Sequence, residues 1–461
     1  MIQSGLLFGK KPLSEVYISF KKRFGDIYQF WISFTRYVIV NNIDDVQYIF
    51  THRNIYDQGE VFLDKFSLFF PDSIICNIGP KYKRHSALTM PLFRRNKVIS
   101  NINIIIDGTD KLLDRWRTIP SGQIDTNIIE QCQNLLLEIF GLIAFDYDLE
   151  TLDNNNLKNK NELTKALQDI INIFRKIINA PRFISIIYLK LSPQYQRAQG
   201  TVQKYLIKMV EEKMSESPDS IAEQKKTSLI ASLLSSLQTD EKAEAKKKEE
   251  DKKGLSRKEI FDELLLFMIA GYETTSTALS WSIYQLSKNP RVQQKIKTEL
   301  MQNNCDQYIS LDRLDSLIYL DCFINEVLRH SPTTDGTGRT VMSNDCLPNS
   351  GTQLYKGDHL IIPTSALARD SRHWKIDPNL FYPERFLNED KNYHPYAFLP
   401  FGGGHRQCLG QELARFELKV ILARMLQQVT FGDGGPEVNA GGSIQSLTIM
   451  PKHVGVTIEF N

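Results

Sequence analysis

Three consecutive glycines, Gly402–Gly404, stand a few residues before a cysteine, Cys408. Because glycine has no Cβ, such a run lets the backbone turn tightly and approach a flat ligand closely. The residues after Gly410 are mostly good helix formers with apolar spacing, so a helix is predicted to begin there. A cysteine just before a helix is favoured as the thiolate, because the partial positive charge of the helix N-terminus stabilises the anion. The sequence therefore predicts a thiolate at Cys408, with the N–H groups of Leu409 and Gly410 directed at its sulfur.

A thiolate held in this way can serve as the axial ligand of a haem iron. The alternative is a buried, inert thiol, which is the common state of an isolated cysteine. Five positions within ten residues favour the ligand: Phe401, Gly404, Arg406, Cys408 and Gly410. Their pattern, Phe-x-x-Gly-x-Arg-x-Cys-x-Gly, resembles the haem-binding loop of the cytochrome P450 superfamily. The resemblance implies haem b as the cofactor and Cys408 as the iron ligand. It also implies a loop shaped around the cofactor by Phe401, Gly404 and Gly410, and a bond from Arg406 to a haem propionate.

A second motif lies in a long apolar stretch that Ser256 and Glu259 open as a capping box. The helix is predicted to run to about Lys288, where Asn289-Pro290 stops it. More than thirty residues at about 1.5 Å each would cross an entire domain. A helix of this length is therefore expected to lie at the centre of the fold.

The middle of this helix reads Ala270-Gly271-Tyr272-Glu273-Thr274-Thr275. Gly271 costs about 1 kcal/mol relative to alanine, and its missing side chain would let a planar cofactor or dioxygen lie against the backbone. Thr274 can bond back to the carbonyl of Ala270 or offer its hydroxyl to a bound oxygen, and Glu273 can pass protons. The alternative is a crossing of two helices at small residues. The segment is similar to the oxygen-activation motif of the family, which implies catalytic roles for Ala270, Gly271, Glu273 and Thr274.

A basic, helix-like stretch covers residues 79–97. In the family the equivalent helix usually offers a tryptophan and, four residues later, an arginine or histidine to one haem propionate. This chain has Tyr82 and Ser86 at those positions, so Lys83 or His85 is the candidate replacement. A solvated basic face is an equally good interpretation, and such a face can also dock an acidic electron-donor protein.

An acid and two arginines form a third motif. Glu326 and Arg329 lie three residues apart on one predicted helix, and Arg385 follows in Pro383-Glu384-Arg385-Phe386. The apolar residues around Glu326 indicate a buried helix, where a charge pair needs further partners. The set resembles the Glu-x-x-Arg plus Arg cluster of the family, which is structural. Between its members, Arg339 resembles the arginine that binds the second propionate.

Composition narrows the class of protein. The chain has 461 residues, 42% of them hydrophobic and 24% charged, with a formal net charge of +2. A charge so close to neutral gives no bulk attraction to nucleic acid. The six cysteines are widely spaced and contain no Cys-x-x-Cys pair, which argues against a disulfide framework or a structural zinc site and for a reducing environment.

No segment reaches the roughly eighteen apolar residues of a membrane span, and Met1–Leu7 is too short for a signal peptide. Eukaryotic members of the family usually begin with a membrane anchor, and the expectation is that this chain carries none and is soluble as written. By resemblance alone, the expected location is the cytosolic face of the endoplasmic reticulum membrane.

The remaining patterns predict a mainly α-helical fold with a smaller β-rich lobe, as the cytochrome P450 resemblance also implies. Expected helices cover residues 14–24, a start at 42, most of 101–237 with breaks at 153–156 and 181, and 414–427; expected strands cover 28–40, 360–363 and 453–460. The highly charged residues 239–253 are interpreted as a mobile or frayed surface connector. The whole chain, 1–461, is expected to be a single catalytic domain.

These features together predict a haem-thiolate monooxygenase that inserts one oxygen atom of O₂ into a lipophilic small molecule. Only 53 residues follow Cys408, too few for a fused flavin module, so the electrons are expected from a separate NADPH-fed reductase. The alternatives are a haem-thiolate isomerase or dehydratase, which would not need Thr274 or a reductase, and a non-enzymatic haem- or lipid-binding protein on the same fold.

Overall fold

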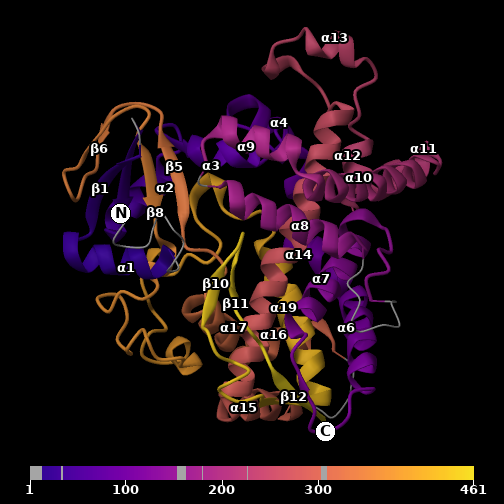
Figure 1. Cartoon of the computed structure of the whole chain (residues 1–461), viewed down its shortest axis with the longest axis vertical. Helices are drawn as coiled ribbons and strands as arrows, with labels where there is room; N and C mark the ends of the chain where they lie inside the picture. The colour runs from indigo at the N-terminus through magenta and orange to yellow at the C-terminus, as the bar shows by residue number, and fades with distance from the viewer. Residues whose placement is uncertain (1–12, 33–34, 153–161, 179, 226, 303–308) are drawn as a thin grey trace.

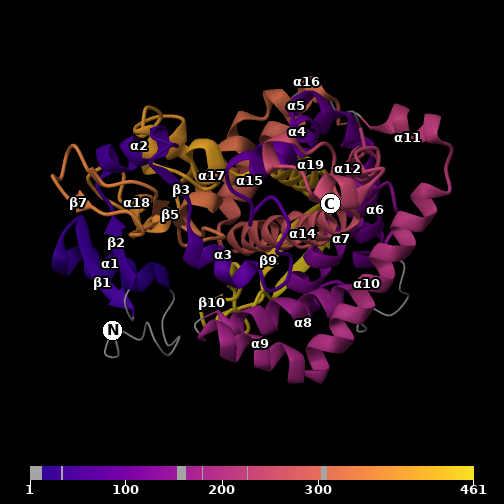
Figure 2. The same ribbon diagram turned by 90° about the horizontal axis from the view of Figure 1, so that it is seen from above.

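Helix α14 (Arg257–Lys288) runs through the middle of the molecule in both views (Figures 1 and 2). The structure is a computed structural model that describes residues 13–32, 35–152, 162–178, 180–225, 227–302 and 309–461. The predicted capping box is present: the Ser256 hydroxyl accepts from the N–H of Glu259, and the Glu259 carboxylate accepts from the N–H of Ser256 at 2.9 Å. Both ends of the central helix are therefore set by local sequence signals.

Other helices surround α14. It packs along α7 and also contacts α17, α19 and the strands β9 and β11. The helices before it are α3 (Glu60–Phe66), α4 (Gly79–Thr89), α5 (Arg95–Val98), α6 (Ile102–Trp116), α7 (Ile128–Phe145), α8 (Glu162–Ile177), α9 (Arg182–Leu191), α10 (Pro193–Met214), α11 (Pro218–Gln224) and α12 (Leu229–Leu234). Those after it are α15 (Pro290–Gln302), α16 (Leu311–Ser316), α17 (Ile318–His330), α18 (Thr364–Leu367) and α19 (Gln411–Gln428). The expected break at residues 153–156 lies outside the described residues, whereas the one at Pro181 is the start of α9.

A β-rich lobe lies to one side of the helices, at the left of Figure 1. Its five-stranded sheet has the order β1 (Ile27–Ile32), β2 (Thr35–Val40), β8 (His359–Ile362), β5 (Thr337–Val341), β3 (Tyr56–Gln58). Helices α1 (Leu13–Phe24) and α2 (Ile43–Thr51) belong to the same lobe, and Asn42 caps α2 as predicted by accepting from Asp44 and Asp45. Parallel pairing of β2 with β8 joins the N-terminal strands to the segment that carries Arg339. The mainly α fold with a smaller β lobe is confirmed.

Three small sheets complete the chain. A three-stranded sheet has the order β4 (Ile124–Asp125), β12 (Val456–Phe460), β9 (Val429–Asp433), and two-stranded ribbons pair β6 (Asp345–Cys346) with β7 (Gln353–Leu354) and β10 (Ser443–Gln445) with β11 (Ile449–Pro451). The β10–β11 hairpin is fastened to α14, because the indole N–H of Trp281 donates to the carbonyl of Ile449 at 2.9 Å. The turn of this hairpin is therefore held against the central helix.

The predicted charge cluster is assembled and fully buried. Glu326 accepts from Arg329 at 2.7 and 2.8 Å and from Arg385 at 3.1 Å. Arg385 also donates to Asp390 at 3.0 Å, so two guanidinium groups face two carboxylates. The arginines also donate to the backbone carbonyls of residues 368, 376, 377, 378 and 380, which ties α17 to the chain that leads into the cysteine loop. The cluster forms as expected, and its structural role stays a prediction.

The charged segment 239–253 is folded, which corrects the expectation of a frayed connector. It contains the short helix α13 (Glu241–Ala245) and the 3₁₀ turn η3 (Glu249–Asp251). Glu249 accepts from the guanidinium of Arg84 on α4 at 3.0 Å, and Glu241 accepts from the N–H of Arg257 at 2.6 Å. Long-range ion pairing of this kind has no local sequence signal, because charge runs are read as solvated by default.

One helix, α7, is long and apolar enough to cross a membrane by length and composition, although no such segment was expected. However, 78% of it is buried inside the protein, between α6, α8, α12 and α14. A core helix passes the same test, so this finding is weak evidence for a span.

Candidate active site

Cys408 lies directly before α19, where the sequence predicts a thiolate. Its own N–H donates to the carbonyl of Phe401 at 2.9 Å, which closes the loop on itself. Burial raises the pKa of the Cys408 thiol above its ordinary value, and the N–H of Gly410, the N-cap of α19, lowers it by a smaller amount. The side chain is nevertheless exposed. The sulfur is therefore accessible to a ligand.

The glycines of the loop are needed for packing against α2. A Cβ at Gly403 would come within 2.8 Å of the Phe50 ring, and one at Gly404, where φ is +70°, would come within 2.6 Å of the Phe50 carbonyl. The expected reason, close approach to a flat ligand, is therefore replaced at these two positions by the contact with Phe50. Gly403 and Gly404 let the loop pack closely against Phe50 of the β lobe, and this contact fixes the position of the loop.

The central helix is open at one point. Ala270 is exposed and Thr274 is half-buried, whereas most residues around them on α14 are buried. The hydroxyl of Thr274 donates to the carbonyl of Ala270 at 3.1 Å, the back-bond that the sequence predicts. An exposed alanine in the middle of a helix that is otherwise packed indicates free space beside it.

Gly271 faces away from that space, contrary to the prediction. A Cβ at this position would come within 2.4 Å of the ring of Phe140 on α7. The Phe140 ring occupies the space where a side chain would lie, so Gly271 allows α7 and α14 to pack closely. The residue that creates this need lies 131 positions earlier in the chain, so no local pattern indicates it.

Two arginines gather near the cysteine loop. Arg339 on β5 is 2% exposed and donates to the Gly403 carbonyl at 2.8 Å, to the Gly338 carbonyl at 2.7 Å and to the Thr337 hydroxyl at 3.0 Å. Burial, reinforced by the charge of Arg406, lowers the pKa of Arg339 to about 10. The three acceptors named here are neutral. A buried guanidinium in this setting favours an anionic partner.

Sequence reasoning missed Asp57 and the role of Tyr82. Asp57 on β3 pairs with Arg406 at 2.9 Å and lies 3.1 Å from His405; burial alone would raise its pKa, but these two contacts hold it at about 2. The guanidinium of Arg406 lies 3.7 Å from the ring centroid of Tyr82, whose hydroxyl donates to the carbonyl of His405 at 2.9 Å. Tyr82 therefore places an aromatic ring on Arg406 where the family usually has tryptophan.

His85 does not replace the missing propionate contact, because two glutamates on α14 hold its ring, whereas the role of Lys83 stays a prediction. His85 is fully buried, with Nδ1 2.5 Å from Glu263 and Nε2 3.3 Å from Glu259, both on α14. Burial lowers the pKa of His85, but hydrogen bonds to the two glutamates outweigh it and raise the pKa overall. Lys83 is exposed.

Glu273 lies on α14, and its side chain is fully buried. Its carboxyl group accepts from the side-chain amide of Gln168 on α8 and from the hydroxyl of Thr448 before β11, each at 3.1 Å. The acid thus lies beside Thr274 in the chain but is held by two other segments.

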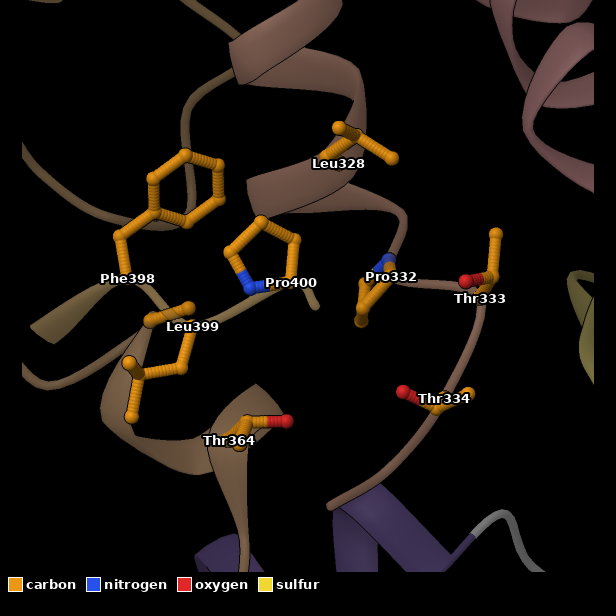
Figure 3. A pocket seen from close by; sticks show the side chains of 9 residues that line it. Leu328, Pro332, Thr333, Thr334, Thr364, Phe398, Leu399 and Pro400 are labelled. Atoms are coloured by element: carbon orange, nitrogen blue, oxygen red, sulfur yellow. The ribbon is translucent and has the colours of Figure 1, made fainter. Parts of the chain in front are cut away.

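A small pocket lies where residues 398–400 meet the end of α17 (Figure 3). The hydroxyls of Thr334 and Thr364 point toward each other across it. Its water-accessible volume of about 10 Å³ leaves room for about one water molecule, so it is a gap between segments and not a substrate site.

Comparisons with known proteins agree with this geometry. The profile described as "Cytochrome P450" matches residues 1–448. The chain belongs to the cytochrome P450 family. Among curated P450s it is 39% identical to cytochrome P450 3A14 of Cavia porcellus over 184 residues (40% of this chain, 36% of that protein) and 41% identical to cytochrome P450 4V2 of Mus musculus over 183 residues (39% and 34%). A longer match, to human cytochrome P450 3A5, is 29% identical over 370 residues (79% and 70%). The chain thus spans about a third of the length of the first relatives that it matches.

P450s bind haem through a cysteine thiolate, and the residues present fit that group. The accessible thiol of Cys408 offers the iron ligand, and the buried Arg339, with Arg406 beside it, offers positive charge to the propionates. Ala270 and Thr274 leave open space on α14, the helix that packs against α19. Gly271 packs against Phe140 and His85 is held by Glu263, whereas Tyr82 and Asp57 contact Arg406.

Proposed function

We propose that this chain is a haem-thiolate monooxygenase, and that residues 1–461 form one catalytic domain. In the proposed reaction a lipophilic substrate, O₂, two electrons and two protons give a hydroxylated product and water. The observation that carries the proposal is the accessible thiol of Cys408 at the N-terminus of α19, on a chain whose central helix opens at Ala270 and Thr274.

The haem, when bound, supplies the chemistry of O₂ activation, and the thiolate ligand favours O–O cleavage. Cys408 would hold the iron, while Arg339 and Arg406 would hold the propionates, with Tyr82 fixing the guanidinium plane of Arg406. Ala270 leaves room on α14, and the Thr274 hydroxyl can exchange its bond to the Ala270 carbonyl for a bond to oxygen in the pocket. Glu273 is the acid that would return a proton to Thr274 Oγ1, because an apolar pocket otherwise excludes protons.

The test measures the fate of oxygen. Purified holoprotein, an NADPH-dependent P450 reductase and ¹⁸O₂ are combined with dodecanoic acid or testosterone as lipophilic probes. One ¹⁸O atom is expected in the product, only when reductase and NADPH are present. A haem-thiolate isomerase would instead rearrange a hydroperoxide such as cumene hydroperoxide without reductase, and a binding protein would retain the spectrum of haem-thiolate without consuming NADPH; either result contradicts the proposal.

The reductase is proposed to dock on the basic face of α4, η1 (Met90–Phe93) and α5. Three basic side chains are exposed there: Lys83, on the same helix as Tyr82, and Arg94 and Arg95 just after it. Exposed charges steer an acidic partner through long-range attraction, which salt screens. In the same assay, therefore, the rate with reductase falls as ionic strength rises from 0.01 to 0.3 M, if the electrons enter by this face.

Association with the cytosolic face of the endoplasmic reticulum membrane is proposed through α9. Large apolar side chains are exposed on and just before this helix: Ile178, Phe183, Ile184, Ile187 and Leu191. Trp31 on β1 is also exposed, and Figure 2 shows α9 and the α1–β1 region on the same side of the molecule. A helix with an exposed apolar face lies favourably in a lipid interface.

The double variant Phe183→Ser/Ile187→Ser is expected to reduce the fraction that sediments with phosphatidylcholine vesicles several-fold, because each exposed side chain contributes to the buried apolar area. Ile207→Ser on α10 is the matched control, since Ile207 is also exposed but lies on a different helix from α9. Equal sedimentation of the double variant and the wild type would contradict the role of α9.

A further inference from the structure

The carboxyl group of Glu273 is held by side chains from two segments far away in the chain. Gln168 Nε2 donates to one oxygen and Thr448 Oγ1 to the other, each at 3.1 Å. Glu273 itself is fully buried. A buried carboxyl group depends on such donors, because it has lost its water.

Thr448 is placed with little freedom. It is the last residue of the turn between β10 and β11, and it is fully buried. The next residue, Ile449, accepts from the indole of Trp281 at 2.9 Å and donates its N–H to the carbonyl of Thr333 at 2.9 Å. The hydroxyl of Thr448 is therefore fixed against α14 by the hairpin and not by its own rotamer alone.

The same hydroxyl lies 3.0 Å from the hydroxyl of Thr277, one helical turn after Glu273. A threonine hydroxyl has one proton and two lone pairs. Because Thr448 gives its proton to Glu273, Thr277 must give its proton to Thr448. The three groups form a directed chain, Thr277 to Thr448 to Glu273, along the buried side of α14.

Gln168 uses both amide protons in a similar way. One goes to Glu273 and the other to the hydroxyl of Tyr272, also at 3.1 Å. Burial, together with the charge of Glu273, raises the pKa of Tyr272 well above its ordinary value, so the phenol keeps its proton. Both donors to Glu273 named here are thus neutral, and both come from outside α14.

We propose that Thr448 and Gln168 are positioning residues for proton delivery: they hold the carboxyl group of Glu273 in the orientation from which it serves Thr274. This inference rests on the proposed monooxygenase function. Hydrogen bonds to a carboxylate stabilise its charged form, so the two donors also set the pH at which Glu273 takes up a proton. Neither residue touches the thiol loop, and neither is a catalytic residue.

The test compares Thr448→Val, Thr448→Ser and Gln168→Leu with wild type. Valine keeps the shape of threonine and removes only the hydroxyl, whereas serine keeps the hydroxyl. The first readout is the infrared C=O band of the protonated carboxyl group of Glu273, identified by its absence in Glu273→Gln and followed against pH. Loss of one donor is expected to move the midpoint of this band upward by about one to two pH units in Thr448→Val, and Thr448→Ser should restore it.

The second readout is coupling, the product formed per NADPH consumed, measured against pH. In Thr448→Val and Gln168→Leu we expect a several-fold rise in released peroxide and a shift of the pH profile in the same direction as the infrared midpoint. Thr109→Val on α6 is the matched control, because Thr109 is also fully buried but donates only to the carbonyl of Ile105. The effect of Thr448→Val should vanish in a Glu273→Gln background.

An unchanged infrared midpoint in Thr448→Val and Gln168→Leu overturns the inference. So does a loss of coupling that equals that of Thr109→Val with no shift of the pH profile, because that is a general effect of a lost buried hydroxyl. Failure of the proposed function is distinct: the wild type would then make no oxygenated product with reductase, while the infrared titration would still report on Glu273.

Discussion

Cys408→Ala is expected to abolish the strongly red-shifted Soret band of the reduced, carbon monoxide-bound protein and to reduce reductase-supported turnover by at least about 100-fold. Changes around a metal ligand already cost 10- to 100-fold, and here the ligand itself is removed. The fold should survive, because the thiol accepts only the weak contact from Gly410 and its own backbone bond to Phe401 is kept. The spectrum and the haem content per protein chain are the measurements.

Cys346→Ala is the matched control, since Cys346 is the other cysteine in the described part of the chain that is exposed. It lies on β6, in the β lobe, and its removal should leave the spectrum and the turnover unchanged. Retention of the parent spectrum in Cys408→Ala would refute the assignment of Cys408 as the ligand. Equal losses in both variants would point to general thiol chemistry.

Features encoded by neighbouring residues could be predicted from the sequence. The capping box at Ser256 and the stop at Asn289-Pro290 define α14, and Gly410 defines the start of α19, because caps act within one helical turn. The back-bond of Thr274 spans four residues. The charge cluster around Glu326 was also predictable, but only through the resemblance, since its third member lies 59 residues away.

The failures share one physical cause, which is a partner distant in sequence. Gly271 packs against Phe140, and Gly404 packs against Phe50. Arg406 donates to Asp57, which lies 349 residues earlier in the chain. Each glycine was correctly identified as necessary, but the group that fills the space could not be named. His85 was misassigned for the same reason, since nothing near it in the chain indicates the two glutamates on α14.

The site therefore has two layers of different origin. Two short sequence motifs determine the thiol loop and the opening of α14. The residues that hold them in place come from the β lobe, from α7, from α8 and from the β10–β11 hairpin. Because the central helix contacts α7, α17, α19 and β11, a change at these distant positions can move the site without touching it.

Glu326→Gln is expected to destabilise the protein by about 3–5 kcal/mol, the cost of leaving a buried charge without its partner. Glu326, Arg329 and Arg385 are all fully buried, and the glutamate accepts four hydrogen bonds, the fourth from the N–H of Tyr382 at 2.8 Å. Glutamine has the same shape but no charge, and its amide would direct N–H donors at guanidinium groups. Against a total stability of about 5–15 kcal/mol, this loss lowers the midpoint of urea unfolding strongly and reduces the yield of haem-loaded protein.

Asp315→Asn is the matched control, because Asp315 pairs with Arg95 at 2.6 Å with both side chains more than half exposed. Solvent screens such a pair, so its removal should change the unfolding free energy by less than about 1 kcal/mol. The haem-loaded fraction of Glu326→Gln should retain near-normal turnover per haem, since the cluster contacts neither Cys408 nor Thr274 through any of its hydrogen bonds described above. A normal unfolding midpoint with lost turnover would reverse this assignment, because it would make Glu326 part of the chemistry and not of the frame that holds the cysteine loop.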